Sequence, residues 1–266
     1  MIEMFAQEFF IKALIVGILI GFSSSYFSAF VVQRKLSFIG SGLSHAAFGG
    51  VALGLLLNIE PLYIAMPFTL IVSILIFYLD NKTKLSTDTI IGVVFSFAVA
   101  MGIIFLALKE SYSQDAYAYL FGSILTVNTM DIIISGVLFI LTLLSFFLFW
   151  ERWAYSTFDS ELARAELLPV DKDNYIFAGI LGLIIALAIK IVGIILISAF
   201  LVIPGATAKL ISKTFFKLTI NSIIIGISTI VAGLVLSYEM DLPSGALIII
   251  IQSFLFLFVT ILSKFK

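Results

Sequence analysis

Residues 174–212 read NYIFAGILGLIIALAIKIVGIILISAFLVIPGATAKLIS, and the only charged residues in this long run are Lys190 and Lys209. The hydrocarbon core of a bilayer is about 30 Å thick, and a helix of about 20 apolar residues crosses it. The run is long enough for two crossings, so it must turn sharply or contain broken helices near residues 190–193. It therefore predicts membrane-spanning helices, and its division decides between eight and nine of them.

The composition of the whole chain leads to the same interpretation. The chain has 266 residues, of which 62% are apolar and 12% are charged, and its mean hydropathy is +1.22. Soluble domains contain about 45–50% apolar and about 25% charged residues. A water-soluble fold of this size could not bury so much apolar surface. We expect one all-α, polytopic membrane helix bundle over residues 1–266, with no soluble domain attached.

Charged residues, Pro or Asn separate nine apolar stretches, each of which is a candidate span. These stretches cover residues 10–33, 36–57, 61–79, 89–108, 131–150, 174–190, 192–212, 216–237 and 244–262. Residues 114–130 are mixed, aromatic and too short for a full crossing, which favours a surface helix or a re-entrant segment. Nine spans are therefore predicted, and eight stay open because the division at 190–193 is weak.

Cysteine is absent from the chain, and the first residues are acidic rather than basic. The missing cysteines exclude a disulfide framework and a thiolate metal site within this chain. Glu3 and Glu8 stand where a secretory signal would carry basic residues, so we expect no cleaved signal peptide.

The positions of the basic residues predict how the chain is oriented, because Lys and Arg in short loops stay on the cytoplasmic side. With nine spans and the N-terminus outside, twelve basic residues fall inside and three outside. The inside set is Arg34, Lys35, Lys82, Lys84, Arg152, Arg164, Lys172, Lys209, Lys213, Lys217, Lys264 and Lys266, and the outside set is Lys12, Lys109 and Lys190. This predicts a cytoplasmic C-terminus and a cytoplasmic loop over residues 151–173.

Small residues recur every four positions in the second stretch, at Gly42, Ala46, Gly50 and Gly54. Residues four apart lie on one helix face, and small residues let membrane helices approach closely. The pattern predicts a helix-packing face, and ordinary bundle packing is its simplest explanation.

His45 is the only histidine, and it lies beside that small-residue face in the middle of an apolar stretch. An ionisable group at membrane depth is costly and faces protein or water, which makes it a candidate functional residue. A structural histidine that donates one hydrogen bond between helices is an equally good explanation from position alone.

Five segments resemble the permeases of zinc, manganese and iron ABC uptake systems, the metal-ion branch of type II ABC importers. Residues 34–54, RKLSFIGSGLSHAAFGGVALG, are similar to a signature whose core is Gly-Asp-Ala-Leu-Ser-His-Ala followed by a Gly-rich stretch. Residues 86–96 (STDTIIGVVFS), 120–127 (LFGSILTV), 158–170 (FDSELARAELLPV) and 192–208 (VGIILISAFLVIPGATA) resemble further family motifs in the expected order. The resemblance therefore extends over nearly the whole chain.

The resemblance implies a multi-pass transport subunit in a prokaryotic cell (inner) membrane, not an enzyme, that moves a divalent metal ion. Its implied partners are membrane lipid, a second copy of the chain in a homodimer, a cytoplasmic ATP-binding subunit and an extracytoplasmic metal-binding protein, and no nucleic acid. The chain contains no G-x-x-x-x-G-K-[ST] loop to hold nucleotide phosphates. ATP hydrolysis would thus belong to the partner, and no cofactor is expected in this chain.

The resemblance also assigns a metal-contacting role to an Asp and the His four residues later. Here the histidine is His45, but Ser41 stands at the Asp position. A hydroxyl is a weaker, neutral ligand than a carboxylate, and weak sites suit transport because a tightly held ion cannot leave. The metal contacts implied by the family are therefore His45 and, in place of the carboxylate, Ser41.

Residues 158–169 predict a short amphipathic helix that Asp159 or Ser160 can cap and Pro169 ends. The family gives this helix the role of coupling to the ATPase, although Leu167 stands where the family often has Gly. A plain solvated helix is the alternative. The expected coupling residues are Phe158, Asp159, Glu161, Leu162, Ala163 and Arg164.

Pro204 and Gly205 interrupt an apolar stretch and free backbone groups that need partners. They mark a possible hinge, and a static kink explains them equally well.

Two other classes of function remain to be weighed against the ABC permease. An ion-coupled secondary transporter acting without an ATPase is favoured by the broken helices. An intramembrane enzyme would need a nucleophile and a base at one depth, which a chain with a single histidine and no cysteine hardly provides. The sequence does not distinguish zinc from manganese or iron.

Overall fold

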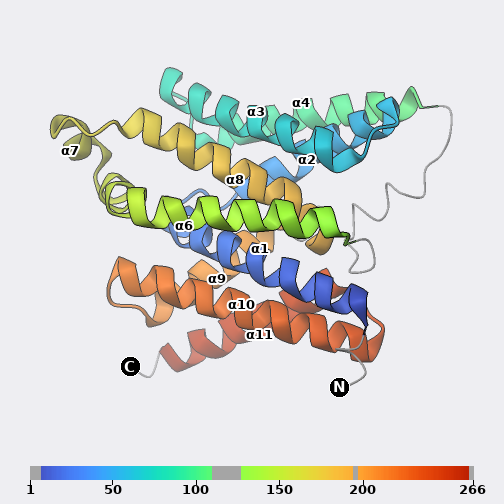
Figure 1. Ribbon diagram of the computed structural model, residues 1–266. Coiled ribbons are helices and arrows are strands. Elements are labelled where there is room, and N and C mark those ends of the chain that lie inside the picture. The colour runs from blue at the N-terminus through green and yellow to red at the C-terminus, as the bar shows by residue number, and fades with distance from the viewer. Residues whose placement is uncertain (1–6, 110–126, 194–196, 264–266) are drawn as a thin grey trace.

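The computed structural model describes residues 7–109, 127–193 and 197–263, and α-helices are the only regular elements in these ranges (Figure 1). The predicted all-α fold is confirmed. The helices are α1 (Glu8–Gln33), α2 (Ile39–Leu57), α3 (Pro61–Lys82), α4 (Thr87–Ala107), α6 (Thr129–Phe158), α7 (Ser160–Ala165), α8 (Val170–Val192), α9 (Ile197–Ile211), α10 (Phe215–Met240) and α11 (Ser244–Ser263).

Each of the nine apolar stretches contains one helix. Eight of the described helices are long and apolar enough to cross a membrane, whereas α9 is apolar but has only 15 residues. The run at 174–212 is broken as expected, because α8 ends at Val192 and Gly193 has a φ of 88°. Most of the segment at 114–130 lies outside the described residues, and its last two residues begin α6.

The helices lie side by side, with α1 near the middle of the bundle (Figure 1). Helix α1 packs against α6, α8, α9 and α10, while α2 packs between α3 and α4. Helix α8 connects the two groups, because it packs against both α3 and α1. Helix α2 and the corner that carries α7 therefore belong to one packed body.

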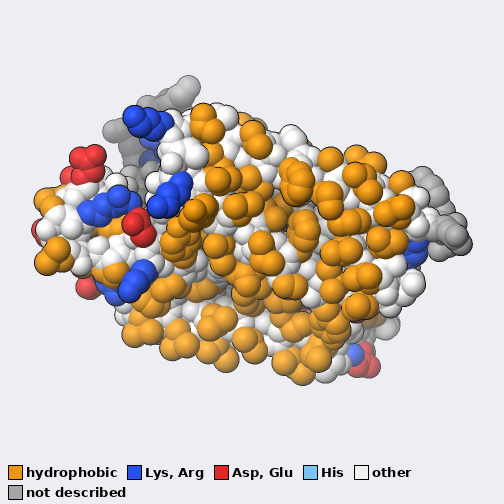
Figure 2. Space-filling view, turned by 90° about the horizontal axis from the view of Figure 1, so that it is seen from above, with side chains coloured by type: hydrophobic (Ala, Val, Ile, Leu, Met, Phe, Trp, Pro, Cys, Tyr) orange, Lys and Arg blue, Asp and Glu red, His pale blue; other side chains and the backbone are white. Residues whose placement is uncertain are grey.

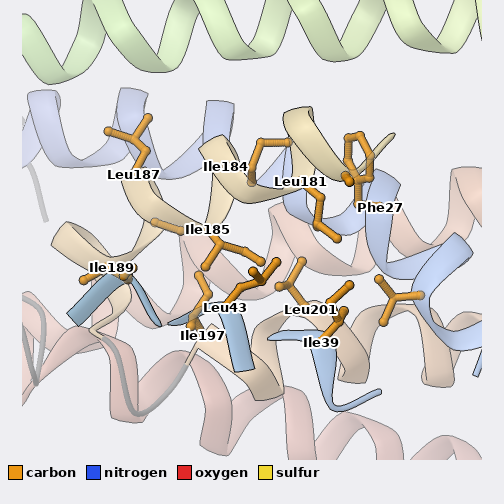
Figure 3. Packing of buried hydrophobic residues seen from close by; sticks show 14 of the residues in the cluster. Phe27, Ile39, Leu43, Leu181, Ile184, Ile185, Leu187, Ile189, Ile197 and Leu201 are labelled. Atoms are coloured by element: carbon orange, nitrogen blue, oxygen red, sulfur yellow. The ribbon is translucent and has the colours of Figure 1, made fainter. Parts of the chain in front are cut away.

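The core at the centre of this body comes from α8, α2, α9 and α1. Leu181 and Ile185 of α8 lie near Leu43 of α2, Leu201 of α9 and Phe27 of α1 (Figure 3). These side chains are almost fully buried. Since lipid is as apolar as these side chains, close packing rather than exclusion from water holds such helices together.

The two ends of the bundle differ in charge. Most of the charged side chains on the face shown in Figure 2 gather near α7, and hydrophobic side chains cover the middle of that face. We call the end that carries α7 the α7 end and the other the distal end. The rings of Phe30 and Phe215 lie 5.0 Å apart at the α7 end, and those of Phe10 and Tyr238 lie 5.3 Å apart at the distal end.

This arrangement places the first turn of α1 and the last turn of α7 at opposite ends of the bundle. The end of α10 lies with the start of α1, so Ser160 and Glu239 are also at opposite ends. Which end faces the cytoplasm stays a prediction that rests on the basic residues.

The small residues of α2 contact two neighbouring helices rather than one. A Cβ atom added at Gly50 would lie 2.7 Å from Cα of Ala65, and one at Gly54 would lie 2.7 Å from Cα of Pro61, both in α3. Gly42 instead faces Ile91 of α4. Ala46, between them, is fully buried. The four residues drift around α2 because the helix repeat of 3.6 residues does not match a spacing of four.

Candidate functional site

His45 lies in the second turn of α2, half-buried between that helix and α4. Its Nδ1 atom is 2.9 Å from the carbonyl oxygen of Ser41, and its ring meets that of Phe95 edge to face at 5.1 Å. A carbonyl oxygen can only accept a hydrogen bond, so Nδ1 carries the proton. In the neutral imidazole this leaves the lone pair on Nε2, the nitrogen that can bind a metal ion.

The backbone carbonyl of Ser41 orients the ring of His45. Its carbonyl oxygen accepts from His45 and also from the hydroxyl of Ser44, at 3.0 Å. A hydrogen bond of this kind holds the ring orientation of a metal-binding histidine. The Ser41 side chain is half-buried on the same face of α2 and carries a neutral hydroxyl.

No group of three or more His, Asp or Glu side chains that could hold a metal ion occurs among the residues that the structure describes. One chain therefore presents a single imidazole and a hydroxyl on this face. Such a pair can make a brief contact with a passing cation, but it lacks the ligand number of a resident structural metal site.

Helix α7 is a single short helix with a well-formed start and end. Asp159 caps it, because its carboxylate accepts a hydrogen bond of 2.9 Å from the backbone N–H of Leu162. At the other end Leu168 N–H donates to Ala163 O and Leu167 N–H to Arg164 O, which is the Schellman pattern. The helix therefore ends at Ala165, before the predicted stop at Pro169, which instead precedes α8.

Leu167 has a left-handed backbone, with φ at 62°. Glycine adopts this conformation freely, and a side chain there costs about 1–2 kcal/mol. Leu167 is nevertheless 90% exposed, so no packing inside the described chain compensates for the cost.

Three apolar side chains point outward around α7. Phe158, Leu162 and Leu167 are 62%, 47% and 90% exposed, and we refer to them as the α7 patch. Asp159, Glu161 and Arg164 are exposed beside it. Ala163 differs from the other expected coupling residues, because its side chain is fully buried and faces the body of the protein.

Polar contacts hold α7 between the end of α6 and the start of α8. The guanidinium of Arg152 makes two hydrogen bonds with the carboxylate of Asp173, at 3.0 and 2.5 Å. The hydroxyl of Tyr155 donates to Glu166 at 2.9 Å. Residues 151–173 are therefore a compact helical corner, made of the last turns of α6, α7 and the first turns of α8, rather than an extended loop.

Pro204 and Gly205 lie inside α9, which continues through them. The backbone N–H of Gly205 donates to the hydroxyl of Ser28 at 2.8 Å, and a Cβ atom at Gly205 would lie 2.5 Å from the carbonyl oxygen of Ser28. This is a close approach of α9 to α1. Hinge motion at this point stays a prediction.

Arg34 is a residue that sequence reasoning counted only as a basic charge near the membrane. In the structure its guanidinium lies among α6 and α8 side chains rather than in solvent. Gly49 was also not singled out, although it approaches Gly102 of α4 closely. The sequence did hold a signal for the burial of Arg34, because this residue directly follows a long apolar stretch.

These features define a multi-pass membrane protein with a short helix that exposes apolar side chains at one end and a single histidine on a half-buried helix face. Residues 6–263 match the family described as the ABC 3 transport family, and the chain belongs to this family. The match covers almost the whole chain, so the family resemblance inferred from the motifs is confirmed.

Named relatives and a solved structure agree with this assignment. The chain is 34% identical to the high-affinity zinc uptake system membrane protein ZnuB of Haemophilus influenzae, over 97% of this chain and 98% of that protein. It is 35% identical to the manganese import system permease protein ScaB of Streptococcus gordonii, over 97% and 94%. A chain in the structure of PsaBC from Streptococcus pneumoniae in complex with Fab superposes with a TM-score of 0.83 at 32% identity, covering 95% of this chain and 91% of that one.

Proposed function

We propose that this chain is the membrane permease subunit of an ATP-binding cassette importer that brings a divalent transition-metal ion, zinc, manganese or iron, into the cell. The observation that carries the proposal is the full-length family match, together with relatives named for zinc uptake and manganese import. The eight long apolar helices are what such a subunit requires.

His45 would be the metal-contacting residue of the path. Its Nδ1–H is held by Ser41 O, which leaves Nε2 for the ion. In a homodimer, a two-fold axis would bring two such helix faces together and double the ligands. Ser41 replaces a carboxylate by a hydroxyl, so the ion would meet less negative charge and be released more readily.

ATP hydrolysis would belong to a separate cytoplasmic subunit, because this chain has no phosphate-binding loop. The α7 patch offers that subunit three exposed apolar side chains on a short capped helix. Closure of the ATPase pair would then move the helices as rigid bodies. An extracytoplasmic binding protein would deliver the metal ion at the distal end.

Reconstitution tests this proposal directly. The permease, its ATPase and its metal-binding protein are placed in liposomes, and uptake of zinc and of manganese is measured with and without ATP. We expect uptake only with ATP and all three proteins. Uptake by the permease alone, driven by an ion gradient, would instead identify a secondary transporter.

A further inference from the structure

Arg34 joins the end of α1 to both helices that flank α7. Its Nε donates to the hydroxyl of Thr157 in α6 at 2.8 Å, and its Nη1 donates to the amide oxygen of Asn174 in α8 at 2.9 Å. Its Nη2 lies 3.4 Å from the carbonyl oxygen of Trp153. One guanidinium therefore links the end of α1 to the end of α6 and the start of α8, the two helices that flank α7.

Two aromatic rings flank this guanidinium, and the carboxylate of Asp173 attracts it electrostatically. It lies 4.6 Å from the ring centre of Phe177 and 5.9 Å from that of Phe30. Burial lowers the pKa of Arg34 to about 10, which leaves it charged at neutral pH. Asp173 is bound directly by Arg152, so Arg34 shares this carboxylate only at longer range. Burying a charge is costly, so a link needed only for stability would be served as well by apolar side chains.

The turn after Arg34 ties the end of α1 to the start of α2. Leu36 N–H donates to Val31 O at 2.9 Å, and Ile39 N–H donates to Leu36 O at 2.9 Å. Leu36 itself is buried. These bonds fix the last turn of α1 against the first turn of α2, and His45 lies in the next turn of α2.

The structure assigns to Arg34 the role of a positioning residue for transport: it fastens the corner that holds α7 to the α1–α2 turn, so that movement of α7 reaches the helix that carries His45. The inference rests on the proposed function, because it requires an ATPase that acts on α7. It adds a residue that belongs neither to the α7 patch nor to the pair of His45 and Ser41, and whose loss separates ATP hydrolysis from metal movement.

The test uses the complete complex in liposomes and measures metal ions moved per ATP hydrolysed. Arg34→Gln removes the guanidinium and its charge, whereas Arg34→Lys keeps the charge. Lys35→Gln is the matched control, because it removes an exposed charge on the same turn. We expect the ratio to fall by about tenfold in Arg34→Gln, within the range for residues that couple distant sites. Arg34→Lys should recover part of it, and Lys35→Gln should match the wild type.

Asn174→Ala supplies a second, independent measurement. Because Asn174 accepts from Arg34, the double variant should be no worse than Arg34→Gln alone, whereas additive losses would show that the two residues act separately and overturn the inference. An unchanged ratio in Arg34→Gln would also overturn it, as would uptake and hydrolysis that fall together with the melting temperature. Absence of ATP-dependent uptake by the wild-type complex would refute the proposed function itself, whatever the variants do.

Discussion

The Nδ1 atom of His45 lies 2.9 Å from the carbonyl oxygen of Ser41, one turn earlier in the same helix. This contact satisfies one ring nitrogen within α2 and does not join two helices. A purely structural histidine would donate a hydrogen bond from one helix to another. Nδ1 makes no such bond, because its partner lies in the same helix. The other nitrogen remains for a ligand.

His45→Ala should reduce ATP-dependent metal uptake by at least about tenfold, the scale on which changes at metal sites act. Expression, assembly and the melting temperature should stay near those of the wild type, because no bond between helices is lost through Nδ1. Uptake and melting are measured on the same preparations. Ser44→Ala is the matched control, since Ser44 also donates to Ser41 O but is buried elsewhere on α2. Normal uptake without His45 would contradict its role in the path.

Ser41→Asp should tighten metal binding and slow release, because a carboxylate is a stronger ligand for a divalent cation than a hydroxyl. The substitution keeps the backbone carbonyl that orients His45. Equilibrium binding of manganese or zinc to the complex and the turnover of uptake are compared with the wild type. Affinity that does not change with this added charge would mean that position 41 does not face the ion.

Single cysteines at Ser160 and Glu239 should report opposite sides of the membrane, since these residues lie at opposite ends of the bundle. The chain has no cysteine of its own, so each label is unique. With an impermeant thiol reagent on intact cells, position 239 should react and position 160 should be protected. The reverse pattern would invert the orientation derived from the basic residues.

Leu162→Asp should weaken binding of the ATPase subunit, because it places a charge in the exposed α7 patch. Co-purification of the ATPase and the melting temperature of the permease are the measurements. Ala163→Asp is the informative comparison: its side chain is buried, so the charge should lower the melting temperature as well. If Leu162→Asp retained the ATPase at wild-type levels, the α7 patch would not be its binding surface.

Leu167→Gly should raise the stability of the permease by about 1 kcal/mol, because glycine adopts the left-handed backbone without strain. If the exposed leucine contacts the ATPase, the same substitution should weaken that complex. Thermal unfolding of the permease alone and affinity for the ATPase separate the two effects. Leu167→Ala, which keeps the strain but shortens the side chain, is the control and should weaken binding without the gain in stability.

Local features of the α7 corner followed from the sequence, but the direction of its side chains did not. Asp159 was one of two predicted caps, and its carboxylate does cap α7. Ala163 was expected among the coupling residues, yet it is buried. The cap depends on bonds within four residues, whereas the buried face of α7 depends on how the corner packs against the rest of the protein.

The sequence by itself determined that this chain is a bundle of membrane helices, where most of those helices lie, and which family it belongs to. Those properties follow from apolar length, turn residues and motifs, because each helix must satisfy its own backbone in lipid. Only the tertiary structure decided the partners of Arg34, since Thr157 and Asn174 are 123 and 140 positions away in the chain. Contacts at such separations arise from the packing of whole helices, which local sequence preferences do not specify.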